Sequence, residues 1–76
     1  MPALPEISYW ELLNLLRAFL SELRGDDSPI IVGKTRSGRS FTVHHQPGHR
    51  VYPEKLAKIL RYAAISRDEF WSWYGG

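Results

Sequence analysis

Apolar residues recur at helical spacing in the first third of the chain, at Tyr9, Leu12, Leu13, Leu16, Phe19, Leu20 and Leu23. Spacing of three and four residues is typical of the buried face of an α-helix. Ser8 and Glu11 have the types and spacing of a capping box at its start, and Gly25 can end it in the left-handed conformation. The pattern therefore predicts a core-forming helix over residues 9–24.

Two segments with strand-like composition follow, at residues 30–35 and 40–45, with a glycine-containing turn at 36–39. This arrangement predicts a β-hairpin. Because side chains alternate between the two faces of a strand, His45 shares the core face of the second segment. His44 then points to the opposite face, towards water or a ligand.

The last third of the chain predicts a loop and two more helices. Pro53 suits the first turn of a helix whose buried face is Leu56, Ile59, Leu60 and Ala63. A second capping box begins at Ser66 and predicts a short helix over residues 67–74.

We therefore expect one α+β domain over residues 1–76, in the order α-β-β-α-α, with a small antiparallel sheet and helices packed on one face. A two-stranded sheet is marginal by itself. The first helix must then cover much of it, or a homodimer must extend it.

Composition narrows the class of protein. The 76 residues include no Cys, which excludes disulfides and thiolate metal sites. The opening residues lack the basic and apolar regions of a secretory signal, and no apolar run is long enough for a membrane span. The sequence predicts a cytoplasmic protein with no membrane contact.

Positive charge is concentrated in the middle of the chain, although the net charge is only +2. Between residues 34 and 61 a single acid, Glu54, stands among seven cations: Lys34, Arg36, Arg39, Arg50, Lys55, Lys58 and Arg61. Such a block suits a polyanion, and phosphate is the commonest one. The alternative interpretation is an ordinary solvated basic face.

The second half of the chain resembles the C-terminal half of HicA-type toxins. The resemblance runs without a gap from Phe41 to Phe70 and rests on Val43, Gly48, Pro53, Leu56, Ile59, Leu60, Ala63, Ile65, Ser66 and Phe70. HicA-type proteins are small ribonucleases of bacterial toxin–antitoxin pairs. The resemblance implies a fold like that of a double-stranded-RNA-binding domain, with a three-stranded antiparallel sheet and two helices on one face. It also implies RNA as ligand, cleavage by a His on the sheet, and an antitoxin as partner.

This chain departs from the family pattern at the catalytic position. The family's His, at the start of its second strand, aligns near residues 28–30, which contain no His. His44, His45 and His49 instead lie within six residues, beside Arg50. Imidazoles can supply the base and the acid of RNA cleavage, and an arginine can stabilise the charge on the phosphate.

The simpler interpretation gives these histidines no catalytic role. His44 then contacts the RNA backbone, His45 is a half-buried strand residue, and His49 bonds a loop carbonyl. A zinc site is disfavoured because His44 and His45 face opposite sides of one strand. The adjacent pair Asp26 and Asp27 offers too few oxygens for a cation. We expect no metal and no cofactor.

The aromatic tail, Trp71, Trp73 and Tyr74, has three interpretations. It caps the core, it binds a partner protein or a second copy of the chain, or it stacks on RNA bases. Partner binding here would fit an alternative function, a non-catalytic protein-interaction module such as an inhibitor or a small subunit of a larger assembly.

Overall fold

The computed structural model describes residues 3–25 and 28–75. Its elements, in order, are α1 (Tyr9–Phe19), β1 (Glu22–Arg24), β2 (Ile30–Lys34), β3 (Ser40–His44), α2 (Pro53–Ala63) and α3 (Arg67–Gly75). The strands form one antiparallel sheet in the order β1-β2-β3. The predicted α+β class is confirmed, and the order of elements is α-β-β-β-α-α.

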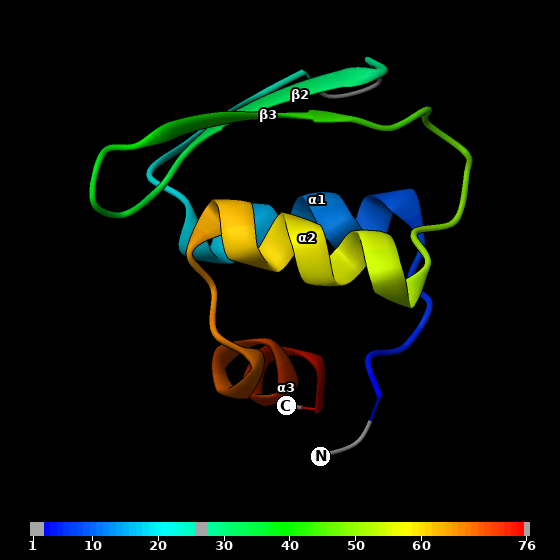
Figure 1. Cartoon of the computed structure of the whole chain (residues 1–76). Coiled ribbons are helices and arrows are strands. Elements are labelled where there is room, and N and C mark those ends of the chain that lie inside the picture. The colour runs from blue at the N-terminus through cyan, green and yellow to red at the C-terminus, as the bar shows by residue number, and fades with distance from the viewer. Residues whose placement is uncertain (1–2, 26–27, 76) are drawn as a thin grey trace.

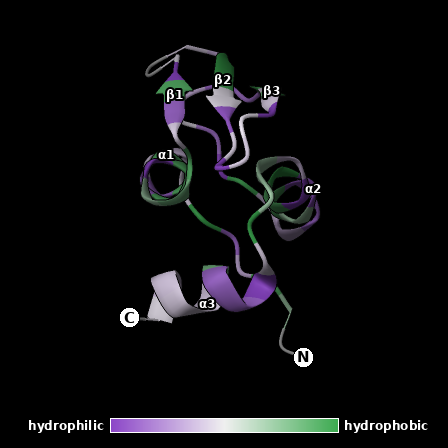
Figure 2. Cartoon of the chain, turned by 90° about the vertical axis from the view of Figure 1, so that its left-hand side faces the viewer, coloured by the Kyte–Doolittle hydropathy of each residue, from purple (hydrophilic) through white to green (hydrophobic). Residues whose placement is uncertain are grey.

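The elements form layers on one side of the sheet (Figures 1 and 2). Helix α1 lies beneath β1 and α2 lies beneath β3, while α3 packs on the far side of this helix pair. Ile31 of β2, Leu12 and Leu16 of α1, and Leu56 of α2 are fully buried between sheet and helices. Phe70 of α3 is fully buried on the other side of the pair. The prediction that the helices lie on one face of the sheet is confirmed.

Both capping boxes form as predicted. The Ser8 amide donates to Glu11 Oε1 at 2.8 Å, and the Glu11 amide donates to Ser8 Oγ at 3.1 Å. At α3 the Ser66 amide donates to Glu69 Oε1 at 2.9 Å, and the Glu69 amide donates to Ser66 Oγ at 3.0 Å. Each box satisfies amides that a helix leaves without partners in its first turn.

The predicted end of the first helix is wrong. Helix α1 stops at Phe19, and Glu22–Arg24 is a third strand paired with β2. The Ser21 hydroxyl donates to the carbonyls of Lys34 and Thr35, at 3.2 and 3.0 Å. Ser21, directly before β1, is thereby joined to the end of β2. Pairing satisfies backbone groups along the edge of β2, a gain that local helical periodicity does not reveal. A partner copy is therefore not needed to give the sheet three strands.

Gly25 has a different role from the predicted helix cap. It has φ 101° and starts the connection from β1 to β2. A Cβ atom at this position would lie 2.2 Å from the Ile30 carbonyl oxygen. The Tyr9 hydroxyl donates to the Ser28 carbonyl at 3.1 Å, which ties this connection to the start of α1.

Arg36 joins the β2–β3 turn to α3. Its guanidinium donates to the two carboxylate oxygens of Glu69 at 2.5 and 3.0 Å, and to the Ala64 carbonyl at 2.6 Å. It also lies 5.5 Å from the centre of the Phe19 ring. Hydrogen bonds from the Arg36 side chain and then from the Ser66 amide lower the pKa of Glu69 to about 2.

The Glu69 pKa gives a pH-dependent contribution to stability. Because folding lowers the pKa of Glu69, its ionised carboxylate stabilises the fold at pH values above 4.5, the ordinary pKa of the group. This stabilisation is lost as the pH falls towards about 2. We expect Glu69→Gln to lower Tm near neutral pH, with a difference from wild type that shrinks through this acid range. Asp68→Asn, an exposed change in the same turn, is the control. If Tm depended on pH in the same way in both variants, the pH-dependent stabilisation would not come from Glu69.

Within the described part of the chain, no helix is long and apolar enough to cross a bilayer. The pair Asp26 and Asp27 lies outside the described residues.

Candidate nucleic-acid interface

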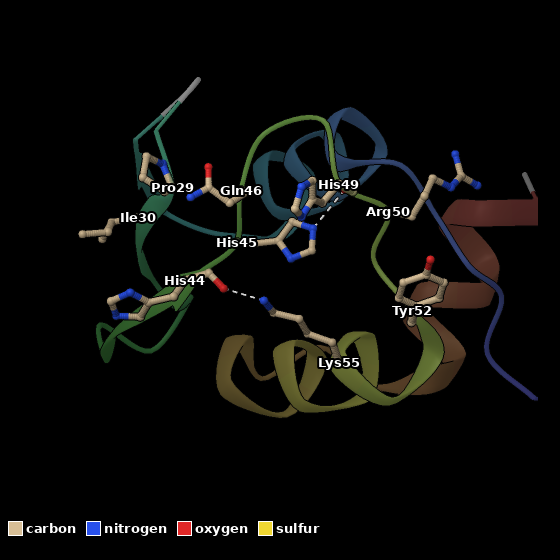
Figure 3. A pocket seen from close by; sticks show the side chains of 9 residues that line it. All are labelled: Pro29, Ile30, His44, His45, Gln46, His49, Arg50, Tyr52 and Lys55. Carbon is tan, nitrogen blue, oxygen red and sulfur yellow. Dashed lines mark hydrogen bonds between the residues drawn. The ribbon is translucent and has the colours of Figure 1, made fainter.

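An open pocket of about 750 Å³ lies where β3 ends, between the sheet and the start of α2 (Figure 3). It is lined by Pro29, Ile30, His44, His45, Gln46, His49, Arg50, Tyr52 and Lys55. All three predicted histidines and two of the predicted phosphate-binding cations therefore meet in one place.

Backbone pairing between distant segments builds this pocket. His44 lies opposite Ile30 in the β2–β3 register, and the His45 amide extends the ladder by donating to the Pro29 carbonyl at 2.9 Å. The loop after β3 returns to the start of the chain, where Ile7 and Val51 form an antiparallel bridge with hydrogen bonds of 3.0 and 2.8 Å. This bridge fixes the end of the loop just before α2 begins.

The three histidines have different environments. His45 is only 8% exposed, and its ring stacks on Tyr9 with 6.2 Å between ring centres and 9° between planes. His45 Nε2 lies 3.0 Å from the His49 carbonyl oxygen. His44 and His49 are both exposed. His45 is thus a packed residue of the pocket wall, whereas His44 and His49 are available to a ligand.

Lys55 brings a cation from α2 to the edge of the sheet. Its ammonium group donates to the His44 carbonyl, and partial burial lowers its pKa. The residue lies in the first turn of α2, where backbone amides lack helical partners and the helix dipole is positive. The N-cap residue Tyr52 makes no side-chain capping bond there. The start of α2 therefore offers an anion one ammonium group and unpaired amides, although the carboxylate of Glu54 lies in the same turn.

Arg50 is balanced by a carboxylate of the protein. Its Nε donates to Glu6 Oε2 at 2.7 Å at an exposed edge of the pocket. Its positive charge is consequently less available to a phosphate than that of Lys55.

The predicted cations do not form one continuous surface. Lys34 and Arg39 flank the β2–β3 turn, whereas the pocket lies at the opposite ends of these strands, and Arg36 in the turn is paired with Glu69. Lys58 is exposed on α2, and Arg61 lines a separate hollow with Ala57, Leu60, Ile65 and Arg67. Only His44, Arg50 and Lys55, of the eight predicted RNA-binding residues, line the pocket.

The aromatic tail is divided between core and surface. Trp71 and Trp73 are partly buried against the core, next to the fully buried Phe70. Tyr74 is 41% exposed. The packing of both tryptophans fits the interpretation in which the tail caps the core.

Sequence reasoning missed four of the residues that line the pocket, Pro29, Ile30, Gln46 and Tyr52, and also Tyr9, which stacks on His45. Tyr52 carried a usable signal, because the residue before a proline is held extended, which directs it away from the helix. Tyr9 carried none, since nothing local indicates that it stacks on His45. Among the described residues, no three His, Cys, Asp or Glu side chains gather closely enough to hold a metal ion.

In comparisons with protein-family models, curated proteins and solved structures, nothing matches the chain.

Proposed function

We propose that this protein binds RNA in the cytoplasm through the pocket at the end of β3. The observation that carries the proposal is one concave site lined by Lys55 and by the exposed residues His44 and His49, with the His44 ring at its outer edge, pointing away from the other two histidines (Figure 3). Ammonium and imidazole N–H groups donate hydrogen bonds to phosphate oxygens, and the first turn of α2 adds its dipole.

The resemblance to HicA-type toxins supports RNA as the anion. It implies a three-stranded antiparallel sheet with two helices on one face, and the sheet with α1 and α2 has that arrangement. The family's catalytic position aligns near residue 30, and His44 lies directly opposite Ile30 in the sheet. An antitoxin protein is the partner that the resemblance implies.

Binding is better supported than cleavage. Cleavage needs a base and an acid placed on either side of one phosphate. His45 already lies within hydrogen-bond distance of the His49 carbonyl, and alternation along the strand separates its ring from that of His44. The proposed function is therefore RNA binding without hydrolysis.

A salt series with labelled single-stranded RNA tests the proposal. Neutralising a phosphate contributes a slope of about −0.7 to log K against log salt for single strands. With one or two cationic contacts in the pocket, from Lys55 and Arg50, we expect affinity to fall about three- to sevenfold between about 50 and 200 mM salt. Lys55→Ala should weaken binding and reduce the slope by about 0.7.

Lys58→Ala is the matched control, since it removes one cation from α2 outside the pocket. We expect it to leave the slope unchanged. A flat response of the wild type to salt, or equal slopes for the two variants, would contradict the proposal. RNA should be recovered at full length. Cleavage that disappears on changing His44, His45 and His49 to Ala would show instead that the site is catalytic.

The alternative, a protein-interaction module, has one observation in its favour. Ile30 and Val32, 45% and 42% exposed, lie on the sheet face away from the helices. If the wild type bound no RNA, the protein-interaction module would be the remaining candidate function.

A further inference from the structure

The pocket has an exposed aromatic side chain at one end. In Figure 3, Tyr52 lies at one side of the pocket and Pro29 and Ile30 lie at the other, with His45 and Lys55 between them. Tyr52 is 61% exposed. The pocket therefore contains polar and cationic side chains together with an aromatic ring that does not pack in the core.

The backbone holds Tyr52 firmly although its ring is exposed. Val51 is fully buried and bridged to Ile7, and Pro53 begins α2 directly after Tyr52. Tyr52 itself is extended, with φ −79° and ψ 158°. Because the backbone is already fixed, a ligand that packs on the ring orders only the two side-chain torsions of Tyr52, which limits the entropic cost of binding.

The Tyr52 side chain has no evident structural role. Within the described residues it makes no hydrogen bond or ring contact. A large aromatic ring exposed beside a concave polar site is typical of a ligand contact.

Tyr52 and Lys55 line the same pocket from the start of α2. In Figure 3 the Lys55 side chain extends towards the His44 carbonyl and the Tyr52 ring lies at the other side of the pocket, so a nucleotide that contacts both residues spans the space between them. The pocket volume, about 750 Å³, lies within the range of about 300–1,000 Å³ that is typical of small-ligand sites.

We propose that Tyr52 is a base-stacking residue of the pocket and that the site takes a nucleotide whose base is unpaired. This inference rests on the proposed RNA-binding function and specifies its substrate class. Every base has a π face, so stacking on Tyr52 tolerates different sequences. Bases inside a duplex are stacked on their neighbours and cannot lie on a protein ring, so single strands, loops or bulges are the ligands.

The test compares three RNAs in anisotropy titrations at low salt: a labelled single strand, its full duplex, and the same single strand with abasic sites. Stacking on one ring is worth about 1–3 kcal/mol per base, so we expect Tyr52→Ala to weaken single-strand binding roughly tenfold. It should change duplex and abasic binding by less than about twofold, because neither presents a base to the ring. Tyr52→Phe should restore single-strand affinity.

Tyr62→Ala is the matched control, because Tyr62 is a similarly exposed tyrosine of α2, at 52%, that does not line the pocket. It should bind all three RNAs like the wild type. Equal effects of Tyr52→Ala and Tyr62→Ala, or an equal loss for base-bearing and abasic strands, would overturn the stacking role. If the stacking role were overturned but the wild type still bound RNA with a salt slope that depends on Lys55, the proposed RNA-binding function would stand. A wild type that binds no RNA would overturn both.

Discussion

Replacing Phe70 with alanine is expected to lower the free energy of unfolding by about 3–5 kcal/mol. Phe70 is fully buried, and the rings of Trp71, Trp73 and Tyr74 lie 5.3, 6.1 and 5.4 Å from its ring centre. Truncation would leave a cavity that this fixed cluster cannot fill. A domain of this size has a stability of only about 3–5 kcal/mol, so the variant should be largely unfolded. Urea denaturation followed by circular dichroism measures the loss.

Tyr74→Ala is the control for this change, because Tyr74 belongs to the same helix but is 41% exposed. We expect a loss of about 1 kcal/mol or less. If both variants were equally stable, α3 would not be part of the core. The expected loss at Phe70 also means that deleting residues 70–76 would disrupt folding, so such a truncation cannot isolate a partner-binding role of the tail.

Gly25→Ala is expected to cost about 2–5 kcal/mol. The left-handed φ of 101° is unfavourable for alanine, typically by about 1–2 kcal/mol. The new Cβ would also lie 2.2 Å from the Ile30 carbonyl oxygen, which forces β1 and β2 to shift and adds about 1–3 kcal/mol. Chemical denaturation measures the total.

Gly38→Ala separates the two causes. Gly38 has a similar φ, 92°, but a Cβ there meets nothing within 4 Å. We expect this variant to lose only the backbone contribution, about 1–2 kcal/mol. If both variants lost the same free energy of unfolding, the overlap between the new Cβ at position 25 and the Ile30 carbonyl would add no cost.

Features set by neighbouring residues were predictable from the sequence. The capping boxes at Ser8 and Ser66 join residues three positions apart, so residue type and spacing suffice to predict them. The burial of His45 and the exposure of His44 follow from strand alternation alone. Pro53 likewise marked the start of α2 correctly.

Features set by distant residues were not predictable. The segment Glu22–Arg24 continues a helical pattern, and only its pairing with β2 makes it a strand. The pocket depends on the bridge between Ile7 and Val51 and on the stack of Tyr9 with His45. The pairing of Arg36 with Glu69 and of Arg50 with Glu6 likewise joins residues far apart in the chain. A charge count along the sequence therefore overestimates the cations available to a ligand.

The bridge between Ile7 and Val51 also orders events during synthesis. The three strands follow one another through short connections, and contacts between such neighbours close small loops at low entropic cost. The bridge must close a loop that contains the whole meander, and it cannot form until residue 51 has left the ribosome. A nascent chain can thus complete its three-stranded sheet before this bridge fixes the loop that borders the pocket.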